Sequence, residues 1–221
     1  MILERNGQTV PKSIPLPGVS NEERHEFMKR FAGIIHLYQS AMQVASTQLE
    51  ILDNEFAAIH DYSPIHHMER RMKSFESIAE KLKRKGHGIS IDSIQHVQDI
   101  AGIRVICNYV DDIYYLRDFI IGKNCFCLIR EQNYIQAPKA NGYRSLHLTV
   151  NVPIVISEGR MELPVEIQLR TIAMDMWASL EHELRYKSER AFTQEEGERL
   201  KQCAETLQQV DDVMQRLFQG K

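Results

Sequence analysis

The stretch ELPVEIQLR at residues 162–170 decides the fold class, because its side chains alternate in character. The odd positions from Leu163 to Leu169 are apolar, and the even positions carry Glu162, Glu166, Gln168 and Arg170. A period of two is typical of a β-strand with one buried face. The polar face is richer in functional groups than solvation requires, so it is a candidate floor for a binding site. An ordinary half-exposed antiparallel sheet has the same alternation, and the pattern alone favours neither interpretation.

Residues 143–152 show the same alternation one strand earlier. Tyr143, Ser145, His147 and Thr149 share one side, and apolar residues occupy the other. If the two strands pair in one sheet, their polar faces form one continuous floor. A tyrosine on that floor can stack on a nucleobase, and histidine or glutamine can hydrogen-bond to a base edge.

Other changes of period divide the rest of the chain. Further strands are expected at 104–109 and 126–130, and helices at 21–59, 65–85, 112–121, 172–186 and 194–218. The sequence therefore predicts an α+β fold with a mixed sheet flanked by helices. We expect a flexible N-terminal tail at 1–20, an N-terminal helix at 21–60, the main domain at 61–190 and a C-terminal helix at 191–221.

The composition limits the class of protein. With 221 residues, of which 43% are hydrophobic and 26% charged, the chain resembles a soluble globular protein with one main core. A formal net charge of −3 provides no overall positive field for nucleic acid, so any phosphate-binding surface must be local. Four cysteines form neither a disulfide framework nor zinc clips, which favours a reducing cytoplasm. No apolar run approaches about 18 residues, so we expect neither a membrane span nor a secretion signal.

Four polar residues recur along the predicted helix 65–85. Lys73, Ser77, Lys81 and Arg84 are spaced by four, four and three, which places them on one helical face. Cations and a hydroxyl group on one face can hold a polyphosphate. A solvated charged face has the same spacing, and from spacing alone this simpler interpretation is favoured.

Asp99 lies just before the strand that carries Arg104, at a position that suits a metal ligand. Magnesium prefers one or two protein carboxylates together with phosphate oxygens. Asp99 and Glu166 would therefore be a sufficient ligand set for Mg²⁺. Taken alone, Asp99 is equally typical of a turn.

Several other nucleotide and metal motifs are absent from the sequence. It contains neither a GxxxxGK[ST] loop nor a GxGxxG fingerprint, so P-loop NTPases and dinucleotide oxidoreductases are not supported. His60-Asp61 and His66-His67 lack the second His and Asp cluster of a metal-dependent phosphohydrolase, and we interpret them as incidental. Trp177 lies among apolar residues and is expected in the core.

Ordered motifs together resemble the synthetase domain of the RelA/SpoT family, specifically its stand-alone small alarmone synthetases. The resemblance covers about residues 61–187. The motifs that carry it are SPIHHMERRMK (63–73), DIAGIRV (99–105), NGYRSLH (141–147), VEIQLRT (165–171) and WASLEH (177–182). It implies a mixed five-stranded β-sheet of nucleotidyltransferase type. It also implies transfer of pyrophosphate from ATP to the 3′-hydroxyl of GDP or GTP, which makes (p)ppGpp for the stringent response, in a magnesium-dependent homotetramer.

The resemblance also implies roles for individual residues. Arg71 and Arg104 match the pair that holds the adenine of ATP. The positions that match the triphosphate site are Lys73, Ser77, Lys81 and Arg84. Asp99 matches a magnesium ligand, and Glu166 matches the carboxylate that activates the acceptor hydroxyl and can also bind the metal.

On the acceptor side, Tyr143 matches the residue that stacks on guanine. The neighbouring contacts to GDP or GTP are Lys139, His147 and Gln168. Asp175 stands where some relatives have asparagine, and Glu181 matches an acidic position to which we assign no role.

In the last helix, apolar residues recur at alternating steps of three and four: Leu200, Cys203, Leu207, Val210, Met214 and Leu217. This seam needs a partner, which is either the N-terminal helix of the same chain or another subunit. The alternatives to an enzyme of this kind are a non-catalytic nucleotide sensor or RNA-binding module, and an alarmone hydrolase. Asp99 and Glu166 argue against the first, and the missing His-Asp cluster argues against the second. The sequence supports neither an RNA partner nor an allosteric nucleotide.

Overall fold

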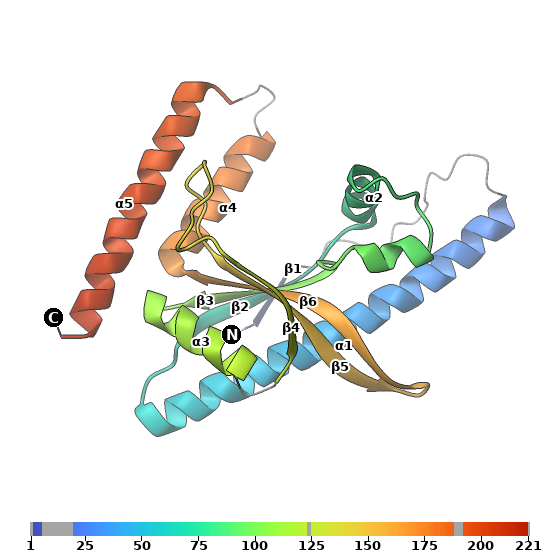
Figure 1. Cartoon of the computed structure of the whole chain (residues 1–221), viewed down its shortest axis with the longest axis horizontal. Coiled ribbons are helices and arrows are strands. Elements are labelled where there is room, and N and C mark those ends of the chain that lie inside the picture. Colours follow the sequence, from blue (N-terminus) through green and yellow to red (C-terminus); the bar gives the residue numbers. More distant parts are fainter. Residues whose placement is uncertain (1, 6–19, 123–124, 188–191, 221) are drawn as a thin grey trace.

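The computed structural model describes residues 2–5, 20–122, 125–187 and 192–220 (Figure 1). The strands are β1 (Ile2–Arg5), β2 (Ile65–Met72), β3 (Ala101–Cys107), β4 (Cys127–Asn133), β5 (Leu146–Ile156) and β6 (Gly159–Thr171). The helices are α1 (Asn21–His60), α2 (Phe75–Arg84), α3 (Val110–Gly122), α4 (Ile172–Lys187), α5 (Gln194–Phe218) and the short 3₁₀-helix η1 (Asp92–His96).

The strands form one mixed sheet in the order β1-β2-β3-β6-β5-β4. β3 and β6 run parallel, whereas β2 pairs antiparallel with β3, and β5 pairs antiparallel with both β6 and β4. Strands β2 to β6 confirm the expected mixed five-stranded sheet flanked by helices. The short strand β1 extends that sheet at its edge, parallel to β2.

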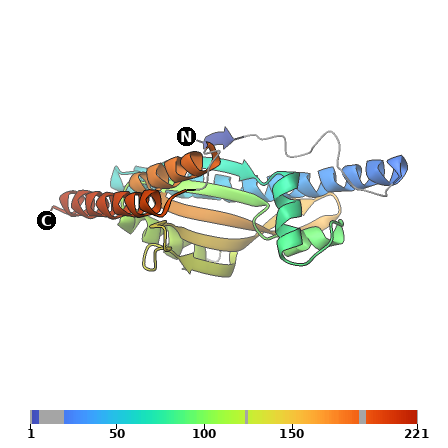
Figure 2. The same ribbon diagram turned by 90° about the horizontal axis from the view of Figure 1, so that it is seen from above.

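One face of the sheet is apolar and closed. Ile103, Leu148 and Ile167 are fully buried on it, and α1 packs across β2, β3, β5 and β6. Phe31 and Leu49 of α1 belong to the same core. Figure 2 looks down on the opposite face, which α2 borders at one end and α4 with α5 at the other, while α1 passes beneath the sheet. The open face is therefore the place for a site.

Residues 65–72 form strand β2, so the prediction of a helix at 65–85 is wrong over this part. The apolar residues Ile65 and Met68 imitate a helical step of three because a bulge lies between Ile65 and His67. The helix begins only at Phe75, where the Ser74 side chain accepts a hydrogen bond from the Ser77 amide. Lys73 therefore precedes the helix.

The predicted flexible tail at 1–20 is also wrong in part. Residues 2–5 form β1, which uses the hydrogen-bonding edge of β2 that β3 leaves open. Ser20 caps α1 through a reciprocal capping box with Glu23. Residues 6–19 lie outside the described residues.

The C-terminal helix α5 packs chiefly against α4 and α3 rather than against α1. Leu200 and Leu207 of the predicted seam are partly buried on this side, whereas Val210, Met214 and Leu217 are exposed. The side chain of Trp177 is buried, as expected, and its indole N–H donates to the Leu200 carbonyl oxygen at 2.8 Å. Another subunit stays the expected partner of the exposed part.

Candidate active site

The sheet register aligns polar residues from four strands on the open face. In one row, Gly102 pairs with Arg71 on one side and Glu166 on the other, and Glu166 pairs in turn with Thr149. In the next row the order is Glu69, Arg104, Gln168 and His147. The polar faces of β5 and β6 thus form the continuous floor that their alternation predicts. Tyr143 and Ser145 lie in the loop before β5 rather than on the strand.

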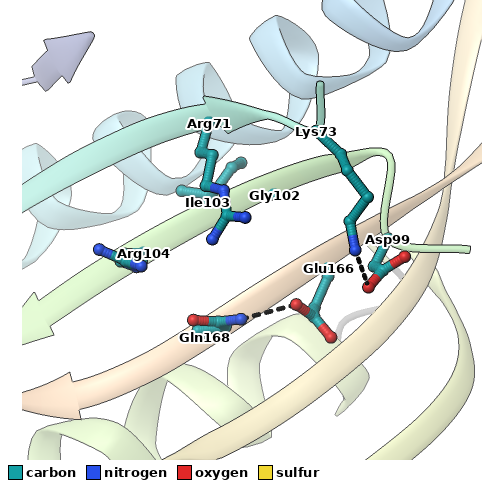
Figure 3. Close-up of a pocket in the computed structure, with 8 residues that line it drawn as sticks. All are labelled: Arg71, Lys73, Asp99, Gly102, Ile103, Arg104, Glu166 and Gln168. Carbon is teal, nitrogen blue, oxygen red and sulfur yellow. Dashed lines mark hydrogen bonds and ion pairs between the residues drawn. The ribbon is translucent and has the colours of Figure 1, made fainter. Parts of the chain in front are cut away.

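A pocket of about 130 Å³ lies over this floor and gathers residues that are far apart in the sequence (Figure 3). Its lining consists of Arg71, Lys73, Asp99, Gly102, Ile103, Arg104, Glu166 and Gln168. A second cleft of about 460 Å³ shares Arg71 and Arg104 and opens between α2 and α4. Ser77, Tyr143 and Arg170 line this larger cleft. Together the two hollows join residues expected on the ATP side with residues expected on the acceptor side.

Asp99 is held by two ammonium groups. Its Oδ2 atom accepts hydrogen bonds from Lys73 Nζ at 2.8 Å and from Lys81 Nζ at 2.6 Å. Burial raises the pKa of Asp99, but the two lysines outweigh burial and hold the pKa below its ordinary value. Asp99 Oδ1 is buried and has no hydrogen-bond partner among the described residues. A charged carboxylate with a spare oxygen fits a cation.

Local structure explains how the lysines reach Asp99. The Lys73 amide donates to the Ile100 carbonyl oxygen at 2.8 Å, which ties the end of β2 to the segment that carries Asp99. Lys81 lies two turns into α2 and points back to the same carboxylate. Ser77 lines the larger cleft, whereas Arg84 is exposed at the end of α2 and lines neither hollow.

Glu166 belongs to a closed ring of five polar side chains. Gln168 Nε2 donates to Glu166 Oε2 at 2.6 Å, and Arg170 Nη2 donates both to Gln168 Oε1 at 2.9 Å and to the Tyr143 hydroxyl oxygen at 2.6 Å. That hydroxyl lies 2.7 Å from His147 Nε2, and His147 Nδ1 lies 3.7 Å from Glu166 Oε1. We call these five residues the Glu166 ring.

The Glu166 ring keeps its carboxylate ionised. Burial raises the pKa of Glu166, but the interactions with His147 and Gln168 outweigh burial and hold the pKa below its ordinary value. Because the Tyr143 hydroxyl accepts from Arg170, its own hydrogen is available for His147 Nε2, which leaves the other imidazole nitrogen to face Glu166 as a donor. The carboxylate is thus oriented on both oxygens.

Arg170 is a site residue to which sequence analysis assigned no role. Its side chain is only 5% exposed, and besides its bonds within the Glu166 ring it donates to Asp175 Oδ1 at 3.1 Å and to Ser145 Oγ at 3.4 Å. The alternation of residues 162–170 places Arg170 on the polar face with Glu166 and Gln168. This shared face was the sequence signal that could have identified Arg170 as a site residue. One guanidinium therefore connects Asp175 to the Glu166 ring.

The remaining acceptor-side residues gather around Tyr143. Lys139 Nζ lies 4.6 Å from the ring centroids of both Tyr134 and Tyr143. Tyr134 meets the Tyr143 ring edge-on at 5.9 Å and was missed by sequence analysis, because it lies outside the alternating stretches. The structure thus brings together Lys139, Tyr143, His147, Gln168 and Asp175.

Cations crowd the other end of the floor. Arg104 Nη1 lies 3.4 Å from Glu69 Oε2, and burial together with the charge of Arg170 lowers the pKa of Arg104. Arg71 lies beside it on the neighbouring strand (Figure 3). Crowded, partly desolvated cations favour an anionic ligand nearby, and the planar guanidinium groups of Arg71 and Arg104 can also stack on a base.

The described residues contain neither of two further features, a metal-binding cluster and a membrane-spanning helix. Among them, no cluster of three or more His, Cys, Asp or Glu side chains could hold a metal. No helix in this part of the chain has the length and apolar character needed to cross a bilayer.

The chain is similar to known proteins in sequence and in fold. Residues 70–191 match the family model described as a region found in RelA / SpoT proteins. The GTP pyrophosphokinase YwaC of Bacillus subtilis is 40% identical over 179 residues, which cover 80% of this chain and 85% of that protein.

Two solved structures share the fold. The small alarmone synthetase 1 of Bacillus subtilis bound to its product pppGpp superposes with a TM-score of 0.79 at 32% identity, over 87% of this chain and 98% of that one. The same synthetase bound to AMPCPP gives a TM-score of 0.73 at 29% identity, over 87% and 97% of the two chains.

Proposed function

The chain belongs to the RelA/SpoT family, and we propose that it is a small alarmone synthetase, a GTP pyrophosphokinase. It transfers the β,γ-pyrophosphate of ATP to the 3′-hydroxyl of GDP or GTP and yields ppGpp or pppGpp together with AMP. The observation that carries the proposal is the Glu166 ring. It fixes an ionised carboxylate between a cation-rich end of the floor and an aromatic, hydrogen-bonding end.

The two ends of the floor suit the two nucleotides. Arg71 and Arg104 hold the adenine of ATP. Lys73 and Lys81, which meet at Asp99, hold its phosphates, and Ser77 lines the larger cleft. Arg84 is exposed at the end of α2 and lines neither hollow, so its assignment to the triphosphate rests on the family resemblance alone. Guanine stacks on Tyr143, and its neighbours on the acceptor side are Lys139, His147, Gln168 and Asp175.

The reaction is an in-line displacement. Glu166 accepts the proton of the guanosine 3′-hydroxyl, the 3′-oxygen forms a bond to the β-phosphorus of ATP, and the bond from that phosphorus to the oxygen shared with the α-phosphate breaks to release AMP. His147 and Gln168 orient the carboxylate, so little reorganisation is needed at the moment of transfer.

The residues present fit a magnesium ion. The buried, unpartnered Oδ1 atom of Asp99 and the nearby Glu166 carboxylate would hold it together with phosphate oxygens. When bound, magnesium neutralises charge on the triphosphate. Lys73 and Lys81 keep Asp99 ionised for this role.

The direct test uses the purified protein with ATP, magnesium and either GDP or GTP. Anion-exchange separation should show AMP and a guanine nucleotide with a 3′-pyrophosphate in equal amounts. If both nucleotides bind and no transfer occurs, the proposed enzyme is wrong and the nucleotide sensor takes its place.

The acceptor side allows a selective test at Tyr143. Tyr143→Ala should weaken GDP binding by about 1–3 kcal/mol, or ~5- to 150-fold, because stacking on the aromatic ring is lost. Tyr143→Phe keeps the stacking but breaks the link between Arg170 and His147, so kcat should fall more than GDP affinity does. Calorimetric titration with GDP and steady-state kinetics separate the two effects. An unchanged GDP affinity in the alanine variant would remove Tyr143 from the site.

We further propose that residues 61–190 act as the synthetase domain and that residues 191–221 help to assemble a homotetramer. Large apolar side chains are exposed in two stripes on helices that lie side by side at one end of the molecule (Figure 1). The stripe on α4 consists of Ile172, Met176, Leu180 and Leu184, and that on α5 of Val210, Val213, Met214 and Leu217. Exposed apolar surface of this extent favours burial between subunits.

The four cysteines are free thiols, which supports a cytoplasmic location.

Light scattering tests the assembly. At micromolar concentration we expect roughly 103 kDa, for four chains of 25.7 kDa each. Leu180→Glu places a charge in the α4 stripe and should lower the mass, because desolvating an unpaired carboxylate is unfavourable. Val155→Glu is the matched control, since Val155 is 83% exposed on the β5–β6 hairpin. A monomeric wild-type protein would refute the tetramer.

A further inference from the structure

Helix α5 reaches the acceptor side of the site through one buried carboxylate. Asp211 Oδ2 accepts hydrogen bonds from Arg144 Nη1 at 3.3 Å and from Thr171 Oγ1 at 3.0 Å. Arg144 directly follows Tyr143, and Thr171 directly follows Arg170. One oxygen atom therefore holds the two segments that carry the aromatic ring and the guanidinium of the Glu166 ring.

A second contact from α5 lies on the other side of Tyr143. Gly142 has a φ of +91°, and a Cβ atom added there would lie 2.7 Å from the Cβ of Ala204. Ala204 lies seven residues, or about two helical turns, before Asp211. Ala204 and Asp211 are also the buried residues of α5. The helix thus brackets Tyr143, with Ala204 against the residue before it and Asp211 against the residue after it.

Burial makes the Asp211 contact rigid. Both side chains of the Arg144–Asp211 ion pair are 8% exposed, so separating them would leave two desolvated charges. Thr171 Oγ1 also accepts a hydrogen bond from the Met174 amide at 3.1 Å, which ties the start of α4 to the same point. A displacement of α5 must therefore move the loop that carries Tyr143 or the end of β6 that carries Arg170.

We propose that Asp211 is a positioning residue that holds Tyr143 and Arg170 in place for the guanine nucleotide, and so couples the packing of α5 to acceptor binding. The identity of the acceptor rests on the proposed function. The expected effect is selective, because Arg71, Lys73 and Asp99 on the ATP side belong to β2 and to the segments that follow β2 and precede β3.

The test compares Asp211→Asn with the matched control Asp212→Asn, which removes the same charge from the neighbouring exposed position of the full-length protein. GDP binding is followed without ATP through the fluorescence of Trp177, the single tryptophan of the chain, whose ring lies 6.4 Å from that of Tyr143. Since the buried Arg144 guanidinium loses its counter-charge, we expect the Kd and KM for GDP to rise about tenfold in Asp211→Asn. The KM for ATP should stay within about twofold, and the control should match the wild type.

Each outcome of this comparison supports or overturns the positioning role of Asp211. Equal increases in the KM for ATP and for GDP would indicate a general structural role, and unchanged constants would indicate no role, so either result overturns the proposal. Arg144→Lys keeps the charge but loses the fork geometry, and it should give the same GDP-selective change if Asp211→Asn does not fold. A wild-type protein that binds GDP but forms no product would overturn the proposed function alone, because the GDP titration requires no turnover.

Discussion

Replacing Glu166 with glutamine should lower kcat by at least about 100-fold, the usual contribution of a general base. The amide keeps the shape of the side chain but cannot accept the proton of the 3′-hydroxyl. It also removes the charge that His147 faces at 3.7 Å. GDP and ATP should still bind, because the Tyr143 stacking surface and the Lys73 ammonium group remain in place. Rapid-quench measurement of AMP and (p)ppGpp formation separates the loss of chemistry from any loss of binding.

Glu162→Gln is the control for that experiment. Glu162 lies on the same strand, β6, and its side chain is 46% exposed. The substitution therefore removes a carboxylate from this strand but leaves the active site unchanged. Turnover near the wild-type value in Glu166→Gln would show that another group accepts the proton. Equal losses in both variants would point to the charge of the strand rather than to the position of Glu166.

The outcome for β6 shows what sequence alternation can establish. Alternation fixes which side chains share a face, because successive residues of a strand point to opposite sides. It therefore placed Glu166, Gln168 and Arg170 together before any partner was known. It could not reveal the Glu166 ring, since closing that ring depends on the rotamers of Tyr143 and His147 on other segments.

The hydrophobic pattern of β2 led to the wrong prediction of a helix. Its bulge gives Ile65 and Met68 a helical spacing, and only pairing with β3 makes the segment a strand. The contacts of Asp99 are equally non-local, because Lys73 and Lys81 come from positions 26 and 18 residues away. Asp211 resembles any surface acid in the sequence, next to Asp212, and only the packing of α5 shows that it is buried.

Asp99→Asn should have the second large effect, with turnover at a fixed magnesium concentration falling by about 10²- to 10³-fold, the usual cost of removing one preorganised electrostatic group. The reason is that asparagine keeps the position but supplies a weaker ligand, and it leaves the Lys73 and Lys81 ammonium groups without their shared counter-charge. Asp92→Asn on the exposed part of η1 controls for the loss of a nearby charge. Full turnover of Asp99→Asn at the same magnesium concentration would exclude the role.

Binding measurements separate a metal ligand from a simple partner of the two lysines. Without magnesium, the Asp99 carboxylate repels the triphosphate and competes for Lys73 and Lys81, so Asp99→Asn should bind a non-hydrolysable ATP analogue as tightly as the wild type or more tightly. With magnesium the order should reverse, because only the wild type can add a charged oxygen ligand to the ion. Calorimetry with and without magnesium measures both affinities. If magnesium strengthens binding equally in the two proteins, Asp99 serves to hold the lysines and not the metal.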